Sequence, residues 1–331
     1  MENSFVNNWI SWYTLNARDL PWRATRDPYA IWLSEILLQQ TRVNQGLPYY
    51  YRFLESFPSV LDLAQAEEDT VLKLWQGLGY YSRARNLMKT ARIIAFDRKG
   101  TFPDSYNDLV DLPGLGPYTA SAIASFAFEK PEAVIDGNAY RVLSRLYDID
   151  LELGSKKVYD IFRQLATDLM KGFLPSTFNQ AMMELGAIVC QPKPNCLACP
   201  ISENCLALRN HSIHLRPVKK KAKPKEKVMK FYKLPITKQG AWILIKLPPK
   251  GIWSGLYVFP EQDAKTFNPN ANTALQLKHL LSHKEMDLSF EIQENAILES
   301  YPNALLIAKE KQSEIPFPVP FLMALKHWKL M

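Results

Sequence analysis

All four cysteines of this 331-residue chain lie between positions 190 and 205. They follow the pattern C-x5-C-x2-C-x5-C, at Cys190, Cys196, Cys199 and Cys205. Four thiolates on one short loop can surround one soft metal centre, and a [4Fe–4S] cluster takes four of them. Zinc also accepts four thiolates, but zinc ribbons usually separate two C-x2-C pairs by a longer spacer. Disulfides suit small secreted domains. The spacing favours a cluster over zinc, and zinc over disulfides.

The length allows two domains with separate cores, and 47% hydrophobic residues indicate a globular chain. The first residues lack the basic and apolar regions of a signal peptide. No apolar run approaches the ~20 residues that cross a bilayer. We therefore expect a cytoplasmic monomer with reduced thiols and no membrane partner.

The net charge of +7 comes from one segment. Positions 216–233 hold nine Lys and Arg against the single acid Glu226, which gives +8, so the remaining residues sum to −1. Such a Lys/Pro segment is most simply a solvated, extended linker, which we place at 216–228. Contact with a phosphate backbone is the second interpretation.

The chain changes character across this linker. Before it, apolar residues recur at helical spacing in the stretches 5–15, 29–38, 60–74, 87–96, 119–128, 140–147 and 159–170. After it, strand-like composition appears at 230–234, 240–247, 253–260 and 287–292, with a helix expected over 271–281. We predict a mainly helical domain over 1–215 and an α+β domain over 229–331.

The sequence LPGLGP at 112–117 joins two helix-like segments. Gly114 and Gly116 allow a tight turn and a close approach of bare backbone to another molecule. Pro117 suits the first turn of the next helix, whose N–H groups can hold an anion such as a DNA phosphate. Phosphate contacts carry no sequence information. An ordinary helix–turn–helix corner is the alternative.

Together these features resemble the MutY family of helix-hairpin-helix DNA glycosylases with an iron–sulfur loop, here 190–205. The segments similar to family signatures are 20–42, 75–86, 112–122 and 135–146. One departure is the first cysteine spacing, which has five residues where the family usually has six. The resemblance implies a nucleoid-associated enzyme that removes adenine opposite 8-oxoguanine or guanine in double-stranded DNA during base excision repair.

Base removal breaks a C1′–N bond through a cationic sugar, so an acid and a carboxylate both help. Glu35 lies in the apolar run IWLSEILL, where desolvation favours its protonated form. The resemblance implies that it protonates N7 of adenine; otherwise a place on a solvated helix face is commoner. Asp136 is implied to face the sugar cation, with Asn138 beside it. A helix cap is the ordinary interpretation of Asp136.

Position 118 separates two reactions. The related endonuclease III branch has a lysine there, which attacks the sugar, forms a Schiff base and leads to strand cutting. Here the residue is Tyr118, between Pro117 and Thr119, and a phenol cannot form an imine. We expect base removal without an efficient lyase step. Tyr118 is otherwise implied to assist near the sugar, or it packs beside the hairpin.

The target base must leave the duplex before it reacts, at a cost of roughly a few kcal/mol. Gln40 and Tyr80 match family residues that enter or press on the base stack, where stacking is worth ~1–3 kcal/mol. Trp22 and Arg23 match positions that line the adenine pocket. The ordinary interpretations are packing after a glycine turn for Tyr80 and an apolar helix entry for Trp22 and Arg23.

The second domain resembles the MutT-like (Nudix-like) domain of the family over 247–260, but the sequence lacks the acidic metal-binding box of active Nudix hydrolases. The family's lesion loop carries Phe-Ser-His, and Leu281, Ser282 and His283 match it here. Ser282 and His283 are implied to contact the lesion; a surface turn is the alternative. Rival functions are a thymine/uracil mismatch glycosylase, a non-catalytic iron–sulfur DNA-binding protein and an active Nudix hydrolase.

Overall fold

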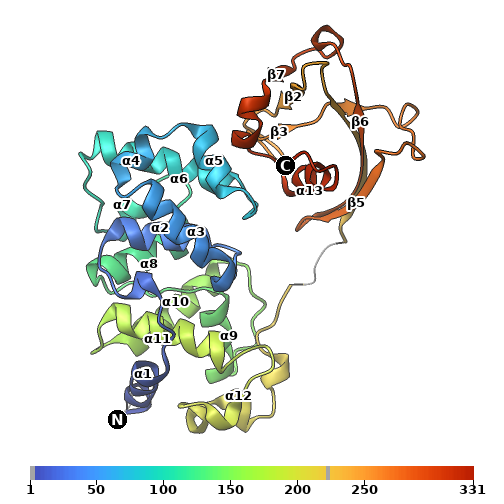
Figure 1. Cartoon of the computed structure of the whole chain (residues 1–331). Helices are drawn as coiled ribbons and strands as arrows, with labels where there is room; N and C mark the ends of the chain where they lie inside the picture. Colours follow the sequence, from blue (N-terminus) through green and yellow to red (C-terminus); the bar gives the residue numbers. More distant parts are fainter. Residues whose placement is uncertain (1–3, 221–223) are drawn as a thin grey trace. The chain divides into compact units, whose positions relative to one another are not determined.

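The computed structural model describes residues 4–220 and 224–331, which divide into two compact units (Figure 1). The first unit comprises 4–43, 59–61 and 90–220. The second comprises 44–58, 62–89 and 224–331. No helix within the described ranges is long and apolar enough to cross a membrane.

The first unit is helical, and the predicted helical character of the N-terminal region is correct. Its helices are α1 (Ser4–Asn16), α2 (Pro28–Leu38), α7 (Tyr106–Val110), α8 (Pro117–Phe128), α9 (Gly137–Leu146), α10 (Lys156–Met170), α11 (Pro175–Ile188) and α12 (Leu206–Arg209). Helix α4 (Val60–Gln65) begins in this unit and continues in the second from Asp62. One core joins α1, α9, α10 and α11, where Trp9, Phe162 and Phe178 are fully buried. Trp9 also donates from Nε1 to the Ala181 carbonyl at 3.1 Å.

Helices α2 and α8 pack together at the centre of this unit. In α2 every residue from 29 to 37 is buried, because a helix that is apolar on all sides belongs in a core. Asp27 caps it by accepting from the backbone N–H groups of Tyr29 at 3.0 Å and Ala30 at 3.3 Å. The same burial encloses Glu35.

Two predicted helices differ in the structure. The stretch 60–74 is two helices, α4 and α5 (Glu68–Trp75), and 87–96 is the end of α6 (Ser82–Arg92) followed by a π-helical turn over Ile93–Asp97. The apolar period alone does not mark the break before Glu68. Helix α3 (Val43–Ser56) was not predicted, since Pro48 and three consecutive tyrosines obscure it.

The second unit contains α3, α5, most of α6, the strands and the final helix α13 (Val319–His327). Its strands are β1 (Glu226–Pro235), β2 (Trp242–Lys246), β3 (Tyr257–Val258), β4 (Glu261–Gln262), β5 (Leu275–Leu280), β6 (Lys284–Gln293) and β7 (Leu305–Ile307). One sheet has the order β4-β1-β6-β5, with β1 and β6 parallel, and the other has the order β3-β2-β7. Phe321 of α13 packs on Tyr232 and Phe290 of the larger sheet, which closes the core.

The helix predicted over 271–281 is wrong. Those residues contain β5, which pairs antiparallel with β6 in the register Leu277 to Leu288. Side chains along β5 alternate between half-buried and exposed, the period of a strand at a sheet edge. Strand β1 begins at Glu226, so the last part of the predicted linker is paired with β6.

Candidate active site

Glu35 and Tyr118 meet inside the first unit. The Tyr118 hydroxyl donates to Glu35 Oε2 at 2.7 Å, which joins α2 to the first turn of α8. Burial raises the pKa of the Glu35 carboxyl to about 7; the Tyr118 hydrogen bond and Arg23 oppose this rise, while the Asp136 carboxylate adds to it. Glu35 can therefore hold a proton near neutral pH and deliver it to a base.

Asp136 lies directly before α9 and caps it. Its Oδ1 accepts from the Ala139 backbone N–H at 2.7 Å, and its Oδ2 accepts from the Asn138 side-chain amide at 2.8 Å. Burial raises the pKa of Asp136, and these hydrogen bonds oppose the rise. The predicted cap geometry is present, and the same carboxylate interacts electrostatically with Glu35 and Tyr118.

Arg141 extends this group toward the cysteine loop, a link that sequence reasoning missed. It donates to Asn138 Oδ1 at 2.7 Å and to the carbonyls of Gly186 at 2.7 Å and Cys190 at 2.6 Å. Gly186 of α11 is required for this packing, since a Cβ there would lie 2.5 Å from the Asn138 Cβ. Arg141 therefore joins Asn138, α11 and the start of the loop.

Arg23 is fixed by a buried acid. It donates to Glu184 Oε2 at 2.6 Å, while Arg18 donates to Oε1 at 2.7 Å and to Oε2 at 2.8 Å. Burial alone would raise the pKa of Glu184, but the hydrogen bonds from Arg18 and Arg23 hold it at about 2. Glu184 thus orients Arg23, whose charge acts on Glu35. The neighbouring Trp22 is buried in the short helix Pro21–Arg23.

The hairpin at 112–117 joins α7 to α8 as the sequence predicts. Gly114 has φ +80°, a conformation that favours glycine. Gly116 caps α8 at φ −82°, and a Cβ there would meet nothing within 4 Å. Thr90 holds the turn by donating to the Pro113 carbonyl at 2.8 Å. The exposed backbone at the start of α8 suits an anion.

The cysteine loop gathers its four thiols around one cavity of about 20 Å³, and none of the four is in a disulfide. Buried Arg145 donates to Cys190 Sγ at 3.4 Å and to the Gln191 carbonyl at 2.6 Å, which closes one side. Among the described residues, no three His, Cys, Asp or Glu side chains are arranged to hold a single metal ion. The four thiols that line this cavity are the donor set that a four-thiolate metal centre takes.

Residues 33–167 match the HhH-GPD superfamily of base excision DNA repair proteins. The adenine DNA glycosylase of Buchnera aphidicola subsp. Baizongia pistaciae (strain Bp) is 35% identical over 292 residues, covering 84% of this chain and 83% of that protein. That of Buchnera aphidicola subsp. Schizaphis graminum (strain Sg) is 38% identical over 258 residues, covering 77% and 74%. The chain belongs to the adenine DNA glycosylase family. A solved thermostable thymine-DNA glycosylase is 31% identical with TM-score 0.57, covering 62% of this chain and 95% of that one.

The two side chains that the resemblance implies to contact the base stack are both exposed. Gln40 follows α2 with φ +55°, and Tyr80 precedes α6 with φ +48°. Left-handed backbone is uncommon for residues other than glycine and often marks functional positions. Tyr80 leaves 47% of its surface exposed, whereas its neighbour Tyr81 is buried at 6%. Tyr80 is therefore available to a partner, and Tyr81 is a core residue.

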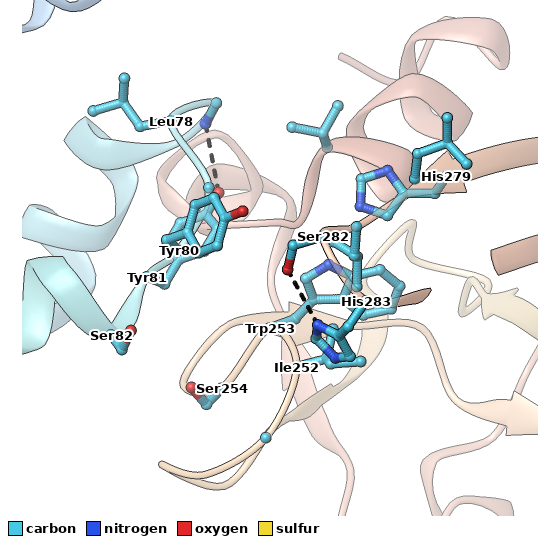
Figure 2. A pocket seen from close by; sticks show the side chains of 16 residues that line it. Leu78, Tyr80, Tyr81, Ser82, Ile252, Trp253, Ser254, His279, Ser282 and His283 are labelled. Atoms are coloured by element: carbon cyan, nitrogen blue, oxygen red, sulfur yellow. Dashed lines mark hydrogen bonds between the residues drawn. The ribbon is translucent and has the colours of Figure 1, made fainter. Parts of the chain in front are cut away.

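Within the second unit, Tyr80 lines a cavity of about 580 Å³ together with Ser282 and His283 (Figure 2). Ser282 Oγ lies 3.2 Å from His283 Nδ1, and both side chains are exposed. Trp253 and His279 line the same cavity with ring centroids 5.8 Å apart; sequence reasoning missed both. A volume of this size, with a mostly apolar wall and a few polar side chains, is typical of small-molecule and base-sized ligand sites.

Proposed function

We propose that this chain, a DNA glycosylase of base excision repair, removes adenine paired with 8-oxoguanine or guanine. The observation that carries the proposal is the 2.7 Å hydrogen bond between Tyr118 and a buried Glu35 whose pKa is raised to about 7. An acid poised near neutral pH is what departure of a neutral base requires. Membership of the adenine DNA glycosylase family supports adenine as that base.

In the proposed reaction Glu35 gives its proton to N7 of the extruded adenine. The C1′–N9 bond then breaks, and adenine keeps the bonding electron pair. The proton on N7 balances that charge, so the base leaves as a neutral molecule. Water adds its hydroxyl to C1′, and the remaining proton restores the acid. The Asp136 carboxylate stabilises the positive sugar, in parallel with the two carboxylates of sugar hydrolases. Asn138 holds the Asp136 carboxylate in place.

The proposed reaction stops at the abasic site. Tyr118 occupies the position where a lysine would attack C1′, and its hydroxyl is committed to Glu35. Burial and the neighbouring carboxylates raise its pKa well above the usual value, so the phenol stays protonated and is a poor nucleophile. Without an amine there, no Schiff base forms and no strand is cut.

We propose that the 580 Å³ cavity receives the oxidised guanine on the opposite strand. 8-Oxoguanine differs from guanine at one edge, where an N7–H donor lies beside a C8 carbonyl acceptor. A hydroxyl can both donate and accept, so Ser282 suits that edge, and His283 can supply a second contact. Tyr80 supplies an aromatic face for stacking. Leu281 replaces the aromatic residue usual in the family loop, and it lines the same cavity.

The mixed four-stranded sheet, the second sheet of three strands and α13, which packs against the larger sheet, support a MutT/Nudix-like lesion-recognition domain at 229–331. The sequence lacks the acidic metal-binding box, so we propose binding without nucleotide hydrolysis. The proposed organisation is a glycosylase domain at 1–215, a basic linker at 216–228 and this domain at 229–331. DNA is the partner, and we propose that the chain acts on it as a monomer in the cytoplasm.

We propose a [4Fe–4S] cluster held by Cys190, Cys196, Cys199 and Cys205. Four thiolates within sixteen residues suit such a cluster, whereas zinc ribbons usually separate two C-x2-C pairs by a longer spacer. When bound, the cluster would brace the loop that Arg141 and Arg145 attach to α9. Iron and sulfide analysis of the purified protein, with zinc measured beside them, tests this assignment.

One assay tests the function. Duplexes bearing A·8-oxoguanine, A·G, T·G or U·G are incubated with the protein, and abasic sites are then cleaved with alkali. Cleavage at adenine, fastest opposite 8-oxoguanine, is the expected result. Cleavage at thymine or uracil alone would favour the mismatch glycosylase that the thymine-DNA glycosylase structure suggests. Binding without any cleavage would favour a non-catalytic DNA-binding protein.

A further inference from the structure

The turn that presents Tyr80 has an unusual backbone. Between α5 and α6, Gly77, Gly79 and Tyr80 all have left-handed φ, at +104°, +70° and +48°. The two glycines adopt these values without cost, but a tyrosine does so only when its surroundings hold it there. The result is a large aromatic side chain that projects from a tight turn with 47% of its surface exposed.

Three contacts fix the backbone of this turn. Trp75 donates from Nε1 to the Gly79 carbonyl at 2.9 Å, and Tyr49 donates from its hydroxyl to the Gln76 carbonyl at 2.7 Å. The Arg83 backbone N–H donates to the Tyr80 carbonyl at 2.9 Å. Gly77 cannot be replaced without movement, because a Cβ there would lie 2.5 Å from the Tyr49 hydroxyl.

The Arg83 side chain lies between the turn and the core. Its Cζ is 5.0 Å from the centroid of the Trp75 ring and 5.8 Å from that of the Tyr80 ring. One guanidinium nitrogen donates to the carbonyls of Gly79 at 3.3 Å and Leu78 at 3.4 Å. Burial lowers the pKa of Arg83 to about 10, so the group is still charged at neutral pH. A planar cation therefore contacts the exposed ring, a buried ring and the turn backbone together.

We propose that Arg83 is a positioning residue that holds the Tyr80 ring in the orientation in which it enters the base stack. The inference rests on the proposed role of Tyr80 as a stacking wedge. A side chain already fixed before binding loses less conformational entropy when it intercalates. Lysine is a poor substitute, because its compact ammonium lacks the planar guanidinium that lies over both the Trp75 and the Tyr80 rings.

The test is a double-mutant cycle on base extrusion. Arg83→Met, Arg83→Lys, Tyr80→Leu and the Arg83→Met/Tyr80→Leu pair are compared by single-turnover cleavage of an A·8-oxoguanine duplex. Extrusion is read separately, in an Asp136→Asn background, from the fluorescence of 2-aminopurine placed beside the adenine. Arg163→Met is the matched control, since Arg163 lies 5.0 Å over the Tyr106 ring in the first unit. Thermal unfolding of every variant reports folding.

We expect Arg83→Met to slow single-turnover cleavage by roughly three- to thirtyfold and to reduce the 2-aminopurine signal. Arg83→Lys should restore only part of both, and Arg163→Met should change neither. In the Tyr80→Leu background Arg83→Met should have no further effect. If it slows cleavage equally in both backgrounds, Arg83 is merely structural and the inference is overturned. If Arg83→Met does not fold, the same cycle with Arg83→Lys decides between these outcomes.

A different result separates this inference from the function itself. If Tyr80→Leu leaves the 2-aminopurine signal unchanged, Tyr80 is not the wedge, and the positioning role proposed for Arg83 is overturned as well. Cleavage of adenine opposite 8-oxoguanine by the unaltered chain would still support the proposed function.

Discussion

Arg141 donates a 2.7 Å hydrogen bond to the side-chain oxygen of Asn138, and this bond decides which way the Asn138 amide faces. With its oxygen engaged by Arg141, the amide nitrogen is directed at Asp136 Oδ2, 2.8 Å away. The second oxygen of Asp136 is held by the Ala139 backbone N–H. Both oxygens of the proposed catalytic carboxylate thus have fixed partners, and one of them depends on a residue anchored to the cysteine loop.

Replacing Arg141 should therefore slow base removal without abolishing DNA binding. Arg141→Met removes the donor to Asn138 and frees the amide to rotate, so the Asp136 carboxylate is less well positioned. Misplaced catalytic groups cost up to about a hundredfold in rate. We expect a ten- to hundredfold loss in single-turnover rate, with duplex affinity within about threefold of the unaltered chain by gel shift. A loss of affinity as large as the loss of rate would show that Arg141 acts mainly on DNA binding.

Two substitutions at Asp136 should separate its role as a cap from its role in chemistry. Asparagine caps helices about as well as aspartate, so the Asp136→Asn variant should keep α9 folded. The variant protein should also bind DNA as tightly as the unaltered chain, but it should no longer remove the base. Asp136→Ala loses the cap as well and should be less stable by about 1 kcal/mol. Single-turnover cleavage, gel shift and thermal unfolding of both variants measure these effects. Normal turnover by Asp136→Asn would remove Asp136 from the mechanism.

The sequence predicts the local elements of the candidate site, whereas the roles of Glu35 and Asp136 in it are implied by the family resemblance. The apolar run around Glu35, the glycine hairpin and the Asp136 cap each lie in one short stretch of chain. The partners that set their chemistry do not: Tyr118 is 83 positions from Glu35, and Glu184 is 161 from Arg23. Arg141 repeats this pattern, since its contacts run to Gly186 and Cys190 on other elements.

The incorrect prediction of a helix over 271–281 shows that a local sequence preference can also mislead. Leucine, lysine and glutamine favour helices, and that weak preference was overridden by pairing with β6. The alternation of Leu275, Gln276, Leu277 and Lys278 already carries the period of a strand. Trp253 and His279 could not have been found in this way, because what unites them is a shared cavity wall formed by distant segments.

The rate of base removal should fall with pH above about 7. Glu35 acts as an acid only while protonated, and burial raises its pKa to about 7. Single-turnover rates measured between pH 6 and 9 should lose about tenfold per pH unit on the alkaline side. Tyr118→Phe removes a hydrogen bond that lowers this pKa, so the falling limb should move to higher pH. If the alkaline limb of the Tyr118→Phe profile stays at the same pH, a group other than Glu35 controls the loss of rate.

Glu35→Gln should lower the rate of base removal and raise the free energy of unfolding at high pH. Losing a general acid typically costs about 10²–10⁴-fold in rate. In the folded chain the Glu35 pKa lies above its usual value of 4.5, so the folded state binds the proton more tightly than the unfolded state. The protonated Glu35 therefore costs the folded state little below pH 4.5. As pH rises from 4.5 toward 7, the unfolded state releases this proton first, and the free energy of unfolding falls. Since glutamine does not titrate, the variant should gain up to about 3 kcal/mol at pH 8 and almost nothing at pH 4, measured by denaturant unfolding. Equal gains at both pH values would place the effect in packing.

Borohydride should fail to trap the chain on DNA. Trapping requires an imine between an amine and C1′, and the hairpin position that would supply it holds Tyr118, whose hydroxyl is bound to Glu35. We expect abasic product without a covalent adduct when a duplex with A·8-oxoguanine is incubated with borohydride and resolved under denaturing conditions. Tyr118→Lys places an amine at the same backbone position and is the matched positive control, since it should yield a trapped band. A strong adduct with the unaltered chain would mean that another amine reaches the sugar, and the reaction would then not end at the abasic site.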